Sequence, residues 1–203
     1  DALVCLHDLI GNALPKHLRK KLHVIKQSAS PLPGPRKPTT RHFDVCVVGH
    51  LREEKDPMRA ALAARLVPER SRLRVIHLGK AHNQAFAKAA QKEMATNPRY
   101  IWKGEVPAWR VRREYARTQA MVISSNQEGG ANVVSEAIAA GVPVIASDID
   151  GNVGLLGKDY AGFYPVRDEA ALAEVLWKAE SEPKFLKELT RQTKKLRPVF
   201  LPK

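Results

Sequence analysis

Residues 124–137 read SSNQEGGANVVSEA, and this stretch decides the fold of the chain. The apolar run Ala120–Ile123 precedes it and predicts a buried parallel strand. Apolar residues then recur at helical spacing from Val133 until Gly141–Pro143 ends the helix. The stretch therefore predicts a strand, a polar glycine turn and a helix start. Free N–H groups and the positive end of a helix dipole meet at such a point, which favours an anion such as phosphate.

The side chains of this turn indicate what could be attached to the phosphate. Gly129 and Gly130 let a ligand approach the main chain without a Cβ in the way. Glu128 and Glu136 flank the anion cradle, and carboxylates do not bind phosphate, so they favour hydroxyl groups such as those of a sugar or a ribose. The alternative is an ordinary strand–helix turn, with a serine near the helix cap and Glu136 solvated.

Strand-like runs alternate with helical patterns from residue 43 onward, which predicts an α/β fold with a doubly wound, Rossmann-like parallel sheet. Strands are expected at 43–48, 73–78, 99–102, 120–123, 143–146 and 162–164. Asp56–Pro57 is expected to cap and open the first helix, on which Leu62 and Leu66 share one face with Met58 and Ala61. Asp168 is expected to cap a later one. Later helices should carry Phe86, Ala89, Ala90 and Met94, then Trp109 and Tyr115, and finally Leu172, Val175, Leu176 and Ala179.

The chain divides into four expected segments. Residues 1–30, with strand-like runs at 2–6 and 23–25 and a short basic helix at 13–20, would end a mostly absent N-terminal Rossmann-like domain. Residues 31–42 are a proline-rich linker. Residues 43–180 form the sheet domain and 181–203 a helical extension.

Two further expectations concern the ends of the chain. Because it begins at Asp1 without a methionine, we expect a fragment of a larger protein. We expect the last helix to cross back to the missing domain, so that Phe185 and Leu189 would be exposed without it and could mediate dimerisation.

Composition narrows the class of ligand. The net charge of +13 suits anions, but the basic residues are scattered and lack aromatic interleaving, so phosphorylated small molecules are favoured over nucleic acid. No run reaches transmembrane length and no membrane anchor is visible. Cys5 and Cys46 lie in apolar runs, which indicates two buried thiols in a reducing cytoplasm. His77 and His82 lack a third partner for a metal.

Ligands of such sheets bind at the carboxyl ends of the strands, so the loops at 49–56, 79–83, 103–107, 125–132 and 147–154 should meet there. Arg52 and Lys55 occupy the first loop. Placed opposite the helix start, they would clamp a diphosphate. The alternative is a solvated polar loop.

Two motifs now carry a family resemblance. Glu128 and Glu136, followed by Ala137–Val144, resemble the E-x7-E signature of retaining glycosyltransferases of the GT-B fold, family 4. The loop Gly49–Lys55 is similar to that family's diphosphate-binding loop. The resemblance implies that residues 43–180 are the nucleotide-sugar-binding domain in the C-terminal half of a GT-B fold. It also implies that the acceptor site belongs to the missing domain.

A narrower resemblance is to the selenosugar synthases of selenoneine biosynthesis. It rests on the segments 49–57, 128–137 and 150–157. It implies a UDP-sugar donor, UDP-N-acetylglucosamine, and selenophosphate as the selenium source, with formation of a carbon–selenium bond. The chain departs from the wider family at His50, where arginine is common, at Gly129–Gly130 and at Gly154, near a usual glutamate.

The resemblance also implies residue roles. Glu136 would bind the ribose, Glu128 the donor sugar, and Glu105–Val106 would lie against the uracil. The expected donor-binding residues are Gly49, His50, Arg52, Lys55, Glu105, Val106, Glu128, Gly129, Gly130, Ala131, Asn132, Val133 and Glu136. Glu128, Arg52 and Lys55 are the catalytic candidates among them. The family typically works without a bound metal, so no cofactor is expected.

Three functions remain open at this point. The chain could be the UDP-sugar half of a selenosugar synthase. It could belong to a conventional retaining glycosyltransferase that acts on a hydroxyl of a lipid or saccharide. It could also be a non-catalytic module that binds a nucleotide-sugar or a partner protein. As a fragment without its acceptor domain, it is expected to bind but not to catalyse.

Overall fold

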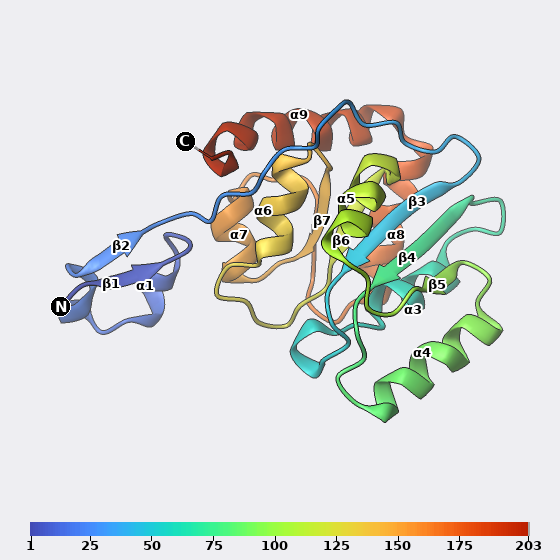
Figure 1. Ribbon diagram of the computed structural model, residues 1–203, viewed down its shortest axis with the longest axis horizontal. Helices are drawn as coiled ribbons and strands as arrows, with labels where there is room; N and C mark the ends of the chain where they lie inside the picture. Colours follow the sequence, from blue (N-terminus) through green and yellow to red (C-terminus); the bar gives the residue numbers. More distant parts are fainter. Residues whose placement is uncertain (203) are drawn as a thin grey trace.

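The computed structural model describes residues 1–202, except for the side chain of Ala13. Its main unit is a six-stranded parallel sheet in the order β5-β4-β3-β6-β7-β8 (Figure 1). The strands are β3 (Phe43–Val48), β4 (Leu73–Leu78), β5 (Tyr100–Trp102), β6 (Ala120–Ile123), β7 (Val144–Ser147) and β8 (Phe163–Tyr164). Within this sheet the chain begins at the central strand β3 and moves outward through β4 to β5. It then returns to the other side of β3 and continues outward from β6 to β8. The predicted doubly wound sheet is therefore confirmed.

Helices cover both faces of this sheet (Figure 1). They are α3 (Arg59–Leu66), α4 (Gln84–Thr96), α5 (Ala108–Arg117), α6 (Asn132–Ala139), α7 (Asp150–Leu156), α8 (Glu169–Ser181) and α9 (Pro183–Phe200). The Asp168 carboxylate accepts the Ala171 N–H at 2.8 Å, so the predicted cap of α8 is confirmed. Cys46 is fully buried in the core and Cys5 is also buried; both are free thiols, as predicted.

The prediction for the first helix is wrong at its start. A short 3-10 turn (Glu53–Lys55) ends at Asp56, which adopts a left-handed conformation with φ 43°. Ser124 donates to the carbonyls of Lys55 and Asp56 at 3.1 and 2.9 Å, and this contact between distant segments holds the turn. Helix α3 therefore begins only at Arg59.

The face shared by Leu62 and Leu66 is not the buried face of α3, because their exposed fractions are 36% and 55%. The alanines of α3 are buried instead, where the helix packs against α8: Ala60, Ala61, Ala63 and Ala64. Small side chains allow this close helix–helix approach.

The loop predicted at 147–154 is also corrected. Helix α7 occupies residues 150–156. Gly151 and Gly154 lower its intrinsic helix propensity, so the sequence favours a loop. Tertiary packing overrides that preference, because both glycines lie where a neighbouring segment comes very close.

The N-terminal part of the chain forms a small unit at one side of the sheet domain (Figure 1). Its strands β1 (Leu3–Cys5) and β2 (Leu22–Val24) pair in parallel. In place of the single predicted helix at 13–20 there are two short ones, α1 (Ile10–Ala13) and α2 (Lys16–Arg19). Pro15 separates them, because a proline has no N–H to continue a helix.

The linker that follows lies along the sheet domain. The Arg36 guanidinium donates to the carbonyls of Gly141 and Tyr115 at 2.7 and 3.2 Å and to that of Thr118. The domain boundaries at 30, 42 and 180 stay a proposal.

Helix α9 packs on α6 and α8. The expectation that Phe185 and Leu189 are exposed is wrong, because Leu189 is fully buried and Phe185 packs against the core. The amphipathic pattern of α9 finds its apolar partners within this chain. Among the described residues, no helix combines the length and apolar character needed to cross a bilayer.

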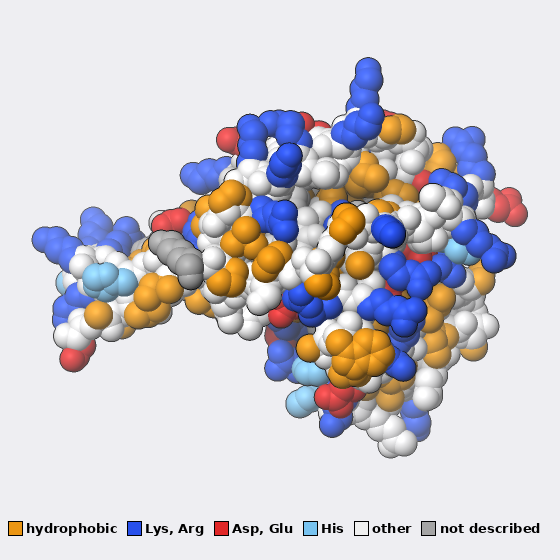
Figure 2. Space-filling model, turned by 45° about the horizontal axis from the view of Figure 1, so that its top comes forward, with side chains coloured by type: hydrophobic (Ala, Val, Ile, Leu, Met, Phe, Trp, Pro, Cys, Tyr) orange, Lys and Arg blue, Asp and Glu red, His pale blue; other side chains and the backbone are white. Residues whose placement is uncertain are grey.

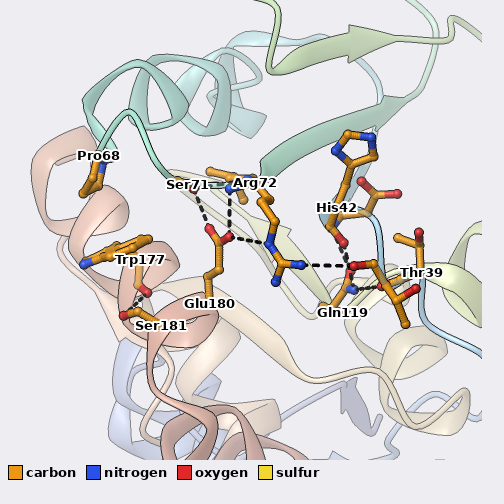
Figure 3. Close-up of polar contacts among 12 residues, drawn as sticks. Thr39, His42, Pro68, Ser71, Arg72, Gln119, Trp177, Glu180 and Ser181 are labelled. Carbon is orange, nitrogen blue, oxygen red and sulfur yellow. Dashed lines mark hydrogen bonds and ion pairs between the residues drawn. The ribbon is translucent and has the colours of Figure 1, made fainter.

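Side-chain bonds close the edge of the sheet where β3, β4 and β6 begin (Figure 3). Glu180 of α8 accepts from the Ser71 hydroxyl and from the Arg72 N–H, the latter at 2.8 Å. Gln119 donates to the carbonyls of Thr39 and His42. These contacts satisfy the polar groups at this edge, and the opposite edge is left for a ligand.

Candidate functional site

Two adjoining cavities lie at the carboxyl ends of the central strands, with volumes of about 610 and 440 Å³. Both are lined by Gln27, Val48, Val111, Asn132 and Val133, so they form one cleft. We call it the donor cleft. The predicted site residues that line the larger cavity are Gly49, His50, Arg52, Lys55, Glu105, Val106, Glu128, Gly130, Ala131, Asn132 and Val133. Glu136 lines the smaller cavity, and Gly129 lies in the same turn without lining either.

A buried histidine fixes the start of the 49–55 loop. The His77 Nε2 lies 3.1 Å from the Gly49 carbonyl oxygen, and its Nδ1 lies 2.9 Å from the Tyr100 hydroxyl. Burial lowers the pKa of His77 to about 4, so the ring is neutral near pH 7. A neutral ring has one N–H, and a carbonyl can only accept, so Nε2 donates to Gly49 and Nδ1 accepts from Tyr100.

The 49–55 loop also packs closely against the segment that follows strand β4. A Cβ on Gly79 would lie 1.8 Å from the Gly49 carbonyl oxygen, so only glycine fits there. The N–H of Lys80 donates to the His50 Nδ1 at 3.0 Å. The role of His77 in holding this loop was not predicted, because His77 was weighed only as a metal ligand. The missed signal is a polar residue inside the otherwise apolar end of strand β4.

Lys55 and Glu128 form an ion pair at the wall of the larger cavity. The Ser125 hydroxyl donates to the same Glu128 oxygen, Oε1, at 2.6 Å. The Asn126 N–H donates to the Glu54 carbonyl at 2.8 Å, which ties the two loops together. The sequence motifs at 49–55 and 124–137 therefore contact each other, as their places at the strand ends predicted.

Arg52 is the second cation of the first loop. It lines the larger cavity with Lys55, and its Nε lies 3.1 Å from a Glu54 carboxylate oxygen. This Nε is buried and makes no hydrogen bond within residues 1–202, although the two side chains as a whole are 41% and 46% exposed, so the guanidinium stays available to an anion.

The start of helix α6 has no side-chain cap, and its N-cap residue is Ala131. The serine cap of the ordinary-turn alternative is therefore not formed. Gly130 has φ 125°, a conformation that favours glycine. The first N–H groups of a helix have no partner four residues back, and the residues at this helix start, Ala131, Asn132 and Val133, line the larger cavity.

Glu136 extends from the second turn of α6 into the smaller cavity. The Tyr115 hydroxyl donates to its Oε2 at 3.4 Å. Desolvation raises the pKa of Glu136, against the opposing effects of the Tyr115 hydrogen bond and the positive charge of Arg112. The other carboxylate oxygen is left to accept hydrogen bonds from a ligand.

The N-terminal unit forms a wall of the cleft that the sequence did not predict. Leu6 and Gln27 line the larger cavity. A Cβ added to Gly130 would lie 2.5 Å from the Leu6 Cβ, and one on Gly154 would lie 2.4 Å from the His7 Nδ1. Gly154, at a position near a glutamate of the wider family, is therefore needed to make room for His7.

Helix α7 packs against the backbone of Glu128. A Cβ on Gly151 would lie 2.3 Å from the Glu128 carbonyl oxygen. The turn at 128–131 thus contacts Gly151 of α7 through Glu128, and it contacts Leu6 of the N-terminal unit through Gly130. Within residues 1–202, no three His, Cys, Asp or Glu side chains are grouped as a metal site.

Comparison with known proteins identifies the family. The family model of glycosyl transferases group 1 matches residues 35–196, which include both motifs of the cleft. The chain belongs to this family. Its fold is that of the C-terminal half of a GT-B glycosyltransferase.

Individual proteins match this chain over only part of their length or at low sequence identity. TuaC of Bacillus subtilis, a glycosyltransferase named for teichuronic acid biosynthesis, is 35% identical over 91 residues, which are 45% of this chain and 23% of TuaC. The crystal structure of Anabaena HepE with UDP and glucose is similar with a TM-score of 0.83 at 14% identity, over 98% of this chain and 59% of HepE. The crystal structure of the pneumococcal O-GlcNAc transferase GtfA with UDP and GlcNAc is similar with a TM-score of 0.76 at 18% identity. The match covers 99% of this chain and 42% of GtfA. The chain thus spans 59% or less of these relatives.

Proposed function

We propose that this chain is the UDP-sugar-binding half of a glycosyltransferase. One observation carries the proposal: Glu128 and Glu136 flank an uncapped helix start, and Arg52 and Lys55 lie in the same cleft. That set has donors for a diphosphate and acceptors for sugar hydroxyls. HepE and GtfA were both crystallised with UDP, which supports UDP as the nucleotide.

The diphosphate would lie between the 49–55 loop and the start of α6. A lysine ammonium has three donors, so Lys55 can keep its bond to Glu128 and still donate to a phosphate oxygen. Negative charge grows on the departing diphosphate as the anomeric bond breaks. Lys55, Arg52 and the N–H groups at the start of α6 would stabilise that charge.

The two glutamates would hold the hydroxyl groups. Ser125 and Lys55 hold the Glu128 carboxylate at the wall of the larger cavity, where it would meet the donor sugar. The Tyr115 hydrogen bond would hold Glu136 in place for the ribose. The segment Glu105–Val106 lines the larger cavity and would lie against the uracil.

Calorimetric titration with UDP tests the donor site. Glu136→Ala should weaken binding at least about tenfold, because a hydrogen bond to a charged group contributes about 1.5–3 kcal/mol. The matched control is Glu174→Ala, at an exposed position of α8. Equal affinity in wild type and Glu136→Ala would refute the ribose role. If wild type does not bind UDP, the titration is repeated on the full-length protein, where lack of binding would refute the donor site.

For the acceptor, we propose selenophosphate, with UDP-N-acetylglucosamine as donor. The proposal is supported by the resemblance of residues 49–57, 128–137 and 150–157 to selenosugar synthases and by the open space beside Gly129. Selenium would attack the anomeric carbon, the bond from that carbon to the diphosphate oxygen would break, and UDP would leave. One water would then cleave the P–Se bond, releasing phosphate and a 1-selenosugar.

A hydroxyl acceptor is the second candidate, favoured by the 35% identity to a glycosyltransferase named for teichuronic acid biosynthesis. Mass spectrometry of full-length protein with UDP-N-acetylglucosamine, given either selenophosphate or saccharide and lipid acceptors, separates the candidates. A selenosugar with stoichiometric UDP supports the first. Transfer only to saccharide or lipid hydroxyls supports the second. UDP binding without turnover on either acceptor would make the chain part of a non-catalytic module.

A further inference from the structure

A hollow outside the donor cleft lies between helix α5 and strands β4 and β5. Its volume is about 480 Å³. It exists because α5 crosses from β5 back to β6 and packs over β3, which leaves the outer strands bare on that face. We call it the basic groove, after the five cations along its walls: Arg74, Lys103, Arg110, Arg113 and Arg117. Figure 2 shows many Lys and Arg side chains on this face of the molecule, with hydrophobic ones between them.

Two of these cations are neutralised. The Nε and Nη2 atoms of Arg74 each donate to one oxygen of the Asp44 carboxylate, both at 2.8 Å. Lys103 Nζ donates to the Glu114 carboxylate at 3.0 Å. The two acidic residues of the groove are therefore engaged by partners on its walls.

The other three cations have no such partner. Arg110, Arg113 and Arg117 follow at intervals of three and four, so they form one stripe along α5. Among residues 1–202, no carboxylate oxygen lies within 4.0 Å of them. Neighbouring like charges on a helix repel, so the stripe favours an anion from outside the chain.

The floor of the groove is apolar. Ile76 and Leu78 of β4 are buried beneath it, and Ile101 of β5 is partly exposed. Next to the stripe, Trp109 is 57% exposed, and the Arg110 guanidinium lies 5.3 Å from its ring centre. A ligand that fits both parts has negative groups on its rim and a flat apolar body.

Shape decides between a small molecule and a surface. The groove is concave, and its volume falls in the range of about 300–1,000 Å³ that is typical of small-molecule sites. A membrane or a nucleic-acid duplex would need an extended face instead. We propose that the basic groove binds a small organic anion that carries two or three negative charges on an aromatic or otherwise flat apolar body. Planar guanidinium groups hold carboxylate, sulfonate or phosphate groups of such a ligand with two hydrogen bonds each.

The test uses the fluorescent trianion 8-hydroxypyrene-1,3,6-trisulfonate, titrated into the whole chain. The groove and the donor cleft share the wall residues Leu78 and Val106, so binding must be located. The double variant Arg113→Gln/Arg117→Gln should bind about tenfold or more weakly. Arg52→Gln, which alters only the donor cleft, should leave affinity within about twofold.

Total charge is controlled separately. Lys194→Gln/Lys195→Gln removes the same charge from exposed positions on α9 and should also leave affinity within about twofold. Equal loss in this control and in the arginine pair would overturn the proposal, because net charge alone would then explain binding. A larger loss in Arg52→Gln would also overturn it. Inorganic tripolyphosphate should bind more weakly than the pyrene; equal affinity would overturn the role of the apolar floor.

Discussion

Replacing His77 by glutamine tests whether a buried neutral imidazole holds the loop that begins the donor cleft. The ring is fully buried and bridges the Gly49 carbonyl and the Tyr100 hydroxyl. A glutamine amide has a donor and an acceptor and can approximate both contacts, but it takes up no proton between pH 4 and 7. The substitution therefore removes the titration while keeping most of the bonding.

The size of the effect follows from the lowered pKa. Burial depresses the pKa of His77 from 6.5 to about 4 in the folded protein. Below pH 6.5 the unfolded chain gains a proton that the folded one excludes, so folding stability is present above pH 6.5 and falls as the pH approaches 4. A shift of that size corresponds to roughly 3 kcal/mol lost from the free energy of unfolding across this window.

Urea unfolding at several pH values between 7 and 4 measures the effect. Wild type should lose roughly 3 kcal/mol more than His77→Gln over this range, since all other titrating groups are common to both proteins. His82→Gln, the same substitution at an exposed histidine, should follow wild type. Parallel curves for wild type and His77→Gln would refute a neutral buried His77 and its role as a donor to Gly49.

Three further experiments test separate parts of the structure. Leu189→Ala should lower the free energy of unfolding by about 2–5 kcal/mol in urea denaturation, and Leu62→Ala by less than about 1, because only Leu189 is fully buried. Gly151→Ala should cost about 1–3 kcal/mol and weaken UDP binding in calorimetry, because its Cβ would collide with the Glu128 carbonyl. Desolvation raises the pKa of Cys46 to about 12, so iodoacetamide should label it at pH 8 only after denaturation, as mapped by mass spectrometry.

Strand positions were predictable because the central strands are buried on both faces and have nearly continuous apolar sequence. Runs such as Phe43–Val48 and Leu73–Leu78 were placed to the residue. Helix starts were predictable where a local side chain caps them, as at Asp168. The start of α3 was not, because Ser124, far away in the sequence, shapes the preceding turn.

The lining of the donor cleft was largely predictable for a topological reason. Parallel strands place their following loops at one edge, so the 49–55 loop and the Glu128–Glu136 segment had to meet. His77 and the wall formed by Leu6 were not predictable. Their roles depend on contacts across the fold, which no local pattern of residues encodes.

Three glycines mark close contacts among the turn at 128–131, helix α7 and the N-terminal unit, and these contacts show which segments the donor cleft needs. Gly151 brings α7 against Glu128, Gly130 admits Leu6, and Gly154 admits His7. Each fit leaves no room for a Cβ, so the positions of the N-terminal unit, the turn and α7 are mutually dependent. Residues 43–180 alone therefore do not make the complete cleft. The N-terminal unit supplies one wall, and any motion of it would change the space beside the sugar-binding glutamate that we propose at position 128.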